Sequence, residues 1–201
     1  MKKIYFDIGA NNGESSLFLA NDPSNIVYAF EPTPFLIKYI ENKILDKTNY
    51  FLIKKAVSDF NGKATFNIAG NADWGCSSLL NFSEKSKTRW INRPDFTVTE
   101  KIEVDVIRLD SFIEEHNIPY ITYLHIDTQG SDLNVLKGLG KYITLVEAGI
   151  LEAASENDIL YNQQNTKQEC IDFLLSNNFE ILNITSNDIH NNEVNISFKR
   201  K

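Results

Sequence analysis

Short apolar runs with strand-like composition alternate along this chain with segments whose apolar residues recur every three or four positions. Strand-like runs occupy residues 3–9, 26–32, 49–59, 65–70, 101–109, 121–127, 145–153, 179–184 and 194–200. Helix-like segments occupy residues 14–21, 33–47, 111–117, 131–142 and 166–178. Strands that alternate with helices of this length predict parallel strands joined by helical crossovers.

The end of the chain breaks this alternation. The last two strand-like runs are separated by the polar, turn-rich stretch TSNDIHNNE, residues 185–193. Two strands joined in this way predict an antiparallel hairpin. The pattern therefore indicates an α/β fold with a mostly parallel sheet and one reversed strand at its edge. Two helix starts are also indicated: Thr33 before Pro34, and Ser111 with Glu114 at capping-box spacing.

Composition narrows the class of protein. The 201 residues are 42% hydrophobic, which suits a single domain, residues 1–201, with its own core. No apolar run approaches the ~20 residues that span a bilayer, and no signal peptide is recognisable, so we expect a cytoplasmic protein without a membrane partner. The net charge of −7 disfavours nucleic acid as a partner. The two cysteines and three histidines are dispersed, so no metal motif is indicated.

A glycine-containing turn follows the first strand-like run, with the sequence DIGANNG at residues 7–13. Gly9 permits a tight turn or a close backbone approach, and Gly13 permits close packing as the next segment begins. A dinucleotide site would need the spacing G-x-G-x-x-G, whereas residue 11 is Asn. Asp7 adds a carboxylate that would repel phosphate. The turn therefore suits a ligand that bears positive charge.

The next strand-like run ends in Glu31, about 20 residues after the turn, where an acidic group commonly binds ribose hydroxyls. A ligand with a ribose, no phosphate and a cationic part is indicated. S-adenosylmethionine (SAM) has these properties.

The motifs DIGANNG, AFEPTP, KKAVSDFNGKATF, VDVIRLDSFI, LHIDTQGSDLNVLKGL and ILEA follow one another in order between residues 4 and 153. This ordered set resembles the FkbM-type family of SAM-dependent methyltransferases. The resemblance implies a doubly wound, seven-stranded Rossmann-like sheet with an antiparallel C-terminal edge strand, and S-adenosylhomocysteine (SAH) as product. The cofactor-binding residues that it implies are Asp7, Gly9, Ala10, Asn11 and Gly13 at the methionine end, Glu31 at the ribose, Val57 and Ser58 at adenine, and Asp127 beside the methyl group.

One motif departs from the family pattern. Members often have Lys-Ile-Asp-x-Glu-Gly-x-Glu where this chain has HIDTQGSD, residues 125–132. His125, Gln129 and Asp132 are the departures. His125 and Asp127 are both candidates for the catalytic base, with a structural histidine as the alternative for His125. Asp127 could instead orient the acceptor, or hold a divalent metal with a sugar diol, so the metal requirement stays open.

An insert at residues 70–100 is the expected acceptor-binding region. It carries both tryptophans and several basic residues, which suit sugar faces and phosphates respectively. The predicted acceptor-binding residues are Trp74, Trp90 and Arg93 from the insert, and Glu152 at a strand end; local packing is the alternative for the tryptophans. Because no helix precedes the first strand-like run, the insert or a second subunit would supply any lid, and we expect a homodimer.

The resemblance implies SAM-dependent O-methylation of a small acceptor, in the first place a sugar or nucleotide sugar. N-methylation of an amino sugar is the alternative within the same chemistry. A degenerate methyltransferase fold that acts as a binding module is a second alternative. An oxidoreductase with a nucleotide cofactor is disfavoured by the missing middle glycine.

Overall fold

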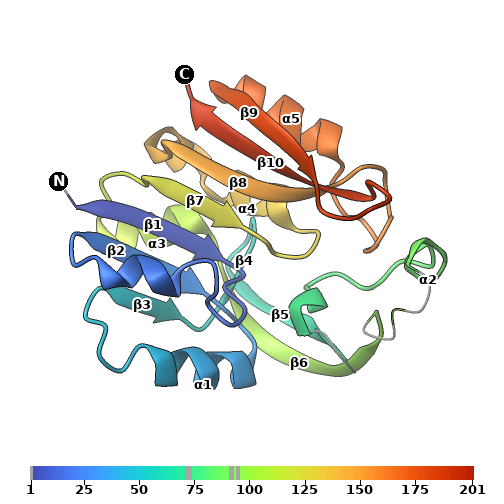
Figure 1. Cartoon of the computed structure of the whole chain (residues 1–201), viewed down its shortest axis with the longest axis horizontal. Helices are drawn as coiled ribbons and strands as arrows, with labels where there is room; N and C mark the ends of the chain where they lie inside the picture. Colours follow the sequence, from blue (N-terminus) through green and yellow to red (C-terminus); the bar gives the residue numbers. More distant parts are fainter. Residues whose placement is uncertain (1, 71–73, 91–92, 94–95) are drawn as a thin grey trace.

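The chain folds around a central β-sheet, seen in a computed structural model that describes residues 2–70, 74–90, 93 and 96–201 (Figure 1). Over these residues the sheet has 7 strands in the order β3-β2-β1-β7-β8-β10-β9. Their bounds, in sheet order, are β3 Tyr50–Ile53, β2 Asn25–Phe30, β1 Lys3–Ile8, β7 Tyr123–Ile126, β8 Ala148–Ala154, β10 Glu193–Arg200 and β9 Phe179–Ser186. The predicted seven-stranded, mostly parallel sheet is confirmed.

The direction of the C-terminal strands decides what lies at one end of the sheet. Neighbours from β3 to β8 run parallel, whereas β10 is antiparallel to both β8 and β9. The predicted antiparallel hairpin is therefore present, with the reversed strand one position inside the edge and β9 outermost. Because Glu193 pairs with Ala154, the hairpin turn at 187–192 lies at the carboxyl end of β8.

A second, smaller sheet carries the insert. It consists of β4 (Ala56–Val57), β6 (Val98–Ile107) and β5 (Gly62–Ala69), and it curves away from the main sheet (Figure 1). The single strand predicted at 49–59 is wrong, since β3 and β4 belong to different sheets. The polar pair Lys54 and Lys55 interrupts the apolar run, and Lys54 reaches Glu41 at 2.5 Å.

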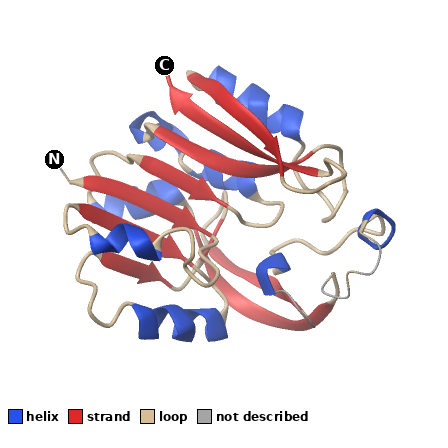
Figure 2. Cartoon of the chain, viewed as in Figure 1, coloured by secondary structure: helices blue, strands red, loops and turns tan. Residues whose placement is uncertain are grey.

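Helices cover the two faces of the main sheet unequally (Figure 2). Helices α3 (Leu109–His116), α4 (Asp132–Gly138) and α5 (Lys167–Ser176) lie behind it in this view, and the 3₁₀ helix η3 (Gly140–Leu145) follows α4. The 3₁₀ helix η1 (Leu17–Asn21) and α1 (Pro34–Lys43) cover β1–β3 on the opposite face. The sheet is thus doubly wound. Across the described chain, no helix covers the front of β7, β8, β10 and β9.

Two local helix predictions differ from the structure. The helix expected at 14–21 is only the short η1; Ser16 precedes it without capping it, and its hydroxyl bonds with that of Tyr50 at 2.9 Å. Ser111 lies inside α3, whose N-cap is Arg108, and its N–H donates to Asp110 at 2.7 Å. Thr33 and Pro34 do begin α1 as predicted.

Strand alternation sorts side chains between the covered core and the other face of the sheet. On β1, Phe6 and Ile8 point into the core beneath α3 and α4, as Leu124 and Ile126 do on β7. Burying each such side chain contributes about 1.5–3 kcal/mol. Asp7 pairs with His125 in the register of β1 and β7, so both lie on the opposite face. In the described part of the chain, the helices are too short or too polar to cross a membrane.

Two shorter helices shape the insert. They are the 3₁₀ helix η2 (Trp74–Cys76) and α2 (Ser86–Arg89). Phe82 forms an isolated bridge with Tyr161, and the two rings stack with centroids 5.2 Å apart. Lys85 donates to the carbonyl oxygen of Asn157 at 2.8 Å, and Arg89 pairs with Glu156 at 3.1 Å. These contacts anchor the insert on residues 156–161, beyond the carboxyl end of β8.

Candidate active site

The glycine turn is fitted to the ends of two neighbouring strands. The N–H groups of Gly9 and Ala10 both donate to the carbonyl oxygen of Phe30, at 3.0 and 2.9 Å. A Cβ on Gly9 would lie 1.9 Å from the carbonyl oxygen of Asp127, so only glycine permits this approach to the end of β7. Asn11 and Gly13 have φ of 51° and 81°. The turn therefore joins the ends of β1, β2 and β7.

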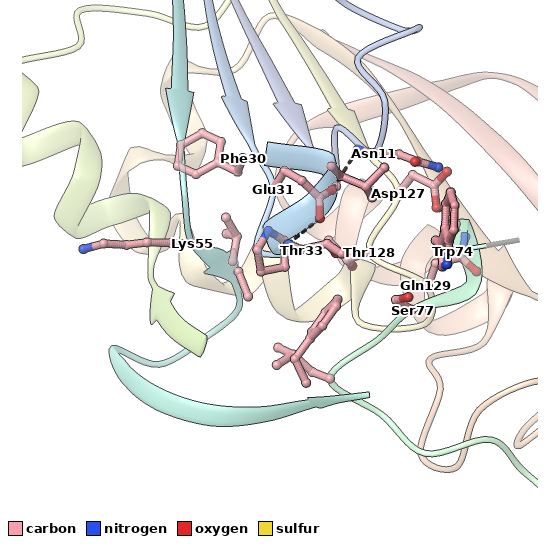
Figure 3. A pocket seen from close by; sticks show the side chains of 18 residues that line it. Asn11, Phe30, Glu31, Thr33, Lys55, Trp74, Ser77, Asp127, Thr128 and Gln129 are labelled. Carbon is pink, nitrogen blue, oxygen red and sulfur yellow. Dashed lines mark hydrogen bonds between the residues drawn. The ribbon is translucent and has the colours of Figure 1, made fainter. Parts of the chain in front are cut away.

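Glu31 is held by backbone donors on either side (Figure 3). Its Oε2 accepts the N–H of Asn11 and its Oε1 accepts the N–H of Thr33, both at 2.8 Å. Each carboxylate oxygen has a second lone-pair direction left for another donor. Burial raises the pKa of Glu31 to about 7, although the hydrogen bonds from Thr33 and Asn11 act in the opposite direction.

A cavity of about 490 Å³ opens beside this carboxylate, and we call it the Glu31 pocket. It is lined by Gly9, Asn11, Phe30, Glu31, Pro32, Thr33, Leu36, Lys55, Ala56, Val57, Phe66, Trp74, Gly75, Ser77, Leu79, Asp127, Thr128 and Gln129. Figure 3 shows Asn11, Glu31, Thr33 and Asp127 close together on one side of it.

A second cavity, of about 700 Å³, lies on the far side of Asp127, and we call it the Glu152 pocket. It is lined by Asn11, Gly75, Cys76, Trp90, Arg93, Phe96, Asp127, Gln129, Glu152, Leu160, Asn187, Asp188 and Glu193. The two pockets share Asn11, Gly75, Asp127 and Gln129. Asp127 and Gln129, in the turn after β7, therefore stand where the cavities meet.

Several carboxyl groups crowd this junction. Burial raises the pKa of Glu152 well above its usual value, and the charges of Asp127 and Glu193 raise it further. Burial also raises the pKa of Glu193 to about 7 and that of Asp132 to about 8. Asp132 lies beneath the turn and accepts the N–H groups of Thr128 and Gly130 at 3.3 and 3.2 Å. Burial and mutual repulsion thus favour the protonated forms of these three carboxyl groups at the junction.

His125 lies elsewhere. Its Nδ1 is 2.7 Å from Oδ1 of Asp7, and both residues line a third cavity of about 650 Å³ together with Tyr5, Phe18 and Tyr123. Burial favours the neutral imidazole, but the hydrogen bond and charge of Asp7 together raise the pKa of His125. Neither residue is among those that line the Glu31 or Glu152 pocket. The structure therefore does not bring the two predicted catalytic residues, His125 and Asp127, into one pocket.

Comparison with known proteins decides the family. A family model described as the methyltransferase FkbM domain matches residues 7–181. The chain belongs to the FkbM methyltransferase family. A curated relative, the 2-O-methyltransferase NoeI of Sinorhizobium fredii, is 27% identical over 186 residues, which are 89% of this chain and 73% of that protein. This FkbM protein is a SAM-dependent methyltransferase, which sets the oxidoreductase alternative aside.

Solved structures of other methyltransferases have a fold similar to that of the FkbM protein. A fibrillarin from Aeropyrum pernix aligns with a TM-score of 0.55 at 12% identity, over 98% of this chain and 66% of that one. An rRNA methylase from Streptococcus thermophilus aligns with a TM-score of 0.52 at 12% identity, over 99% of this chain and 87% of that one. The chain thus spans just under two thirds of the fibrillarin. These likenesses confirm the Rossmann-like methyltransferase fold.

The cofactor residues implied by the family resemblance fall into two groups in this FkbM protein. Gly9, Asn11, Glu31, Val57 and Asp127 line the Glu31 pocket. The others, Asp7, Ala10, Gly13 and Ser58, are not among its lining residues. Gly13 packs against Leu17, and the carbonyl oxygen of Ser58 lies against Gly138 of α4. Asp7 lines the third cavity instead, where it pairs with His125.

The acceptor residues predicted for the FkbM protein also divide. Trp90, Arg93 and Glu152 line the Glu152 pocket, whereas Trp74 lines the Glu31 pocket. Trp74 is 53% exposed and packs on Phe35, with ring centroids 4.6 Å apart. The guanidinium of Arg93 lies over the ring of Phe96 at 4.6 Å. The insert thus contributes one tryptophan to each pocket.

The hairpin was predicted from the sequence, but its turn was not predicted to line a pocket of this FkbM protein. Asn187, Asp188 and Glu193 line the Glu152 pocket, and Asn187 donates to Glu152. The predicted hairpin contained the signal for them. A strand that returns antiparallel beside a parallel strand begins at the carboxyl end of that strand, where ligands bind in open α/β sheets. Among the described residues, no three His, Cys, Asp or Glu side chains are grouped to hold a metal ion.

Proposed function

We propose that this methyltransferase transfers a methyl group from SAM in the Glu31 pocket to a hydroxyl oxygen of a sugar-type acceptor in the Glu152 pocket. The observation that carries the proposal is that the two cavities meet at Asp127. A transferase needs two adjoining sites with a proton acceptor between them. The printed name of the relative NoeI, a 2-O-methyltransferase, supports oxygen as the methylated atom.

The residues of the Glu31 pocket fit the cofactor. The buried carboxylate of Glu31 can accept two ribose hydroxyls beside its two backbone donors. Apolar side chains of Val57, Phe66 and Leu79 offer a surface for adenine. Asp127 supplies negative charge that a cationic sulfonium favours, and the turn at 9–11 lies beside it. These residues would hold SAM with its methyl end toward the junction.

In this reaction the protein itself has to carry out one proton transfer. When bound, SAM supplies a methyl group on a sulfonium, and transfer breaks the carbon–sulfur bond with its electron pair left on sulfur. The acceptor oxygen forms the new bond to carbon, and its hydroxyl proton passes to the carboxylate of Asp127. Gln129 and Glu152 stand beside Asp127 and can orient the acceptor hydroxyl. His125, in its separate cavity, is not needed for this step.

The lining of the Glu152 pocket suits a polyhydroxylated ring. Trp90 and Phe96 provide aromatic surfaces, and Glu152, Asp188 and Asn187 provide hydrogen-bonding groups. Arg93 adds a group that can bind a phosphate, which keeps a nucleotide sugar among the acceptors that we propose. The carboxyl groups specifically favour a second candidate, N-methylation of an amino sugar, because an ammonium would pair with them.

Methyl transfer from labelled SAM to a panel of free sugars, amino sugars and nucleotide sugars tests the proposal. We expect incorporation into at least one sugar class and release of SAH in equal amount. A ribosomal RNA fragment belongs in the same panel, because we propose a small-molecule acceptor in view of the net charge of −7. Methylation of RNA alone, or of no sugar, would overturn the proposed acceptor class. The cytoplasmic location and the homodimer remain predictions, and light scattering tests the second.

A further inference from the structure

Gln129 occupies a backbone conformation that glutamine seldom adopts. Its φ is 56°, and Gly130 follows with φ 96°. The hydroxyl of Ser78, from the insert, donates to the carbonyl oxygen of Gln129 at 2.7 Å and fixes this turn. Because the turn is held in this way, the side chain of Gln129 projects where the Glu31 and Glu152 pockets meet.

The amide of Gln129 bridges the two carboxyl groups at the junction. Its Nε2 donates to Oδ1 of Asp127 at 2.6 Å and lies 3.3 Å from Oε2 of Glu152. At the other end, Oε1 is 2.8 Å from the hydroxyl of the buried Tyr161, which also lies 2.8 Å from the carbonyl oxygen of Cys76. Since the carboxylate of Asp127 only accepts, the amide turns its N–H groups toward it.

We propose that Gln129 is a positioning residue that keeps Asp127 ionised and aimed at the point of methyl transfer, by donating hydrogen bonds to Asp127 and Glu152 at once. This inference rests on the proposed function, in which Asp127 accepts the proton. Donation to the charged form of a carboxyl group stabilises that form. A glutamate at this position would place a third carboxyl group against the other two.

Other charges act on Asp127 from every side. They are His125 on β7, Asp132 on α4, Glu152 on β8 and Glu193 on β10, and Arg93 of the insert lines the same pocket. Three of the four are acids, and their repulsion opposes the ionisation of Asp127. Within this set Gln129 is a neutral donor that reaches two of the carboxyl groups. Its removal should therefore change the protonation of the junction, and not only its shape.

The test compares Gln129→Glu with Gln163→Glu. Gln163 also has a left-handed backbone, with φ 64°, but it is exposed and lies outside both pockets. The assay uses an acceptor from the panel that the wild-type enzyme methylates. With it, we expect Gln129→Glu to move the acidic limb of the pH–rate profile to a higher pH, by about one pH unit. Gln163→Glu should leave the limb in place. A rate loss in Gln129→Glu that is equal at every pH would overturn the inference, since a structural role alone predicts it.

A binding measurement separates this inference from the proposed function. Calorimetry gives the ratio of SAM to SAH affinity as a function of pH without any acceptor. The ratio should fall as Asp127 is protonated, at a higher pH in Gln129→Glu than in the wild type. Gln129→Ala, which loses the donors without adding charge, should shift in the same direction by less. If the affinity ratio depends on pH identically in the wild type and both variants, the role of Gln129 is overturned. If the curves shift as expected but no sugar of the panel is methylated, only the acceptor proposal is overturned.

Discussion

The Glu31 pocket and the Glu152 pocket are built in different ways. Much of the wall of the first comes from residues 9–57, where a turn follows β1 and a carboxylate follows β2. The second is assembled from the insert, the end of β8 and the turn before β10, segments that are far apart in the sequence. The comparison teaches that a local motif encodes the cofactor side, whereas the acceptor side depends on long-range packing.

The largest effect should come from Asp127, which belongs to both pockets. Asp127→Asn removes the proton acceptor but keeps the shape, so methyl transfer should fall by about 10²–10⁴-fold. SAH affinity should change far less, because SAH lacks the sulfonium charge. The rate with labelled SAM and calorimetry with SAH measure the two effects. Asp105→Asn, on the exposed side of β6, is the matched control. Nearly full activity in Asp127→Asn would exclude this base.

Glu31→Gln should affect the Glu31 pocket alone. A hydrogen bond to a charged group contributes about 1.5–3 kcal/mol, so cofactor affinity should fall by about 10–100-fold. Since the pKa of Glu31 is about 7, wild-type affinity should rise as the pH increases through 7, and this rise should disappear in the variant. Calorimetry at several pH values measures both effects. Glu115→Gln, on the exposed side of α3, is the control, and an unchanged SAH affinity in Glu31→Gln would contradict the ribose role.

The two tryptophans allow the pockets to be distinguished by one kind of substitution. Trp90→Ala should raise the KM for the acceptor by up to about tenfold, in line with about 0.5–1.5 kcal/mol for an aromatic contact, and spare SAH binding. Trp74→Ala should weaken SAH binding by a smaller factor, because Trp74 is half exposed, and should spare the acceptor KM. Each variant is the control for the other. If both affect the same ligand, the division of the insert between the pockets is wrong.

The smallest effect concerns stability. The pKa values of Glu31 and Glu193 are raised to about 7, and that of Asp132 to about 8. The folded state therefore holds these protons more tightly than the unfolded state between roughly pH 4 and 8, and stability should fall as the pH rises through this window. We expect Tm to drop by about 5 °C or more between pH 5 and 8. Glu31→Gln should reduce the slope, whereas a Tm that rises over this range would contradict the burial of these acids.

The sequence was sufficient to predict the fold and the cofactor side of the site, for reasons that can be identified. Apolar periodicity predicts the order of strands and helices, and the spacing from Gly9 to Glu31 predicts a ribose-binding turn, because both depend on residues close in sequence. Strand alternation does not place Asp127 beside His125. Asp127 lies in the turn beyond the strand end, where alternation no longer sets the direction of a side chain.

The acceptor side was only partly predictable. The basic residues of the insert suited a phosphate in the sequence, but two of them, Lys85 and Arg89, tie the insert to residues 156 and 157. Trp74 and Trp90 both belong to the insert, yet they line different cavities. The path of the insert is set by distant contacts, such as the bridge between Phe82 and Tyr161, which no local pattern encodes.

The reversal of β10 has a consequence for how acceptor preference could diverge. Because β10 returns beside β8, the turn at 187–192 projects over the Glu152 pocket without carrying any residue of the Glu31 pocket. Surface turns tolerate insertions at little thermodynamic cost. Relatives could therefore lengthen or replace this turn and acquire new acceptors while the cofactor side stays unchanged. For a protein engineer, the hairpin is the segment to exchange first.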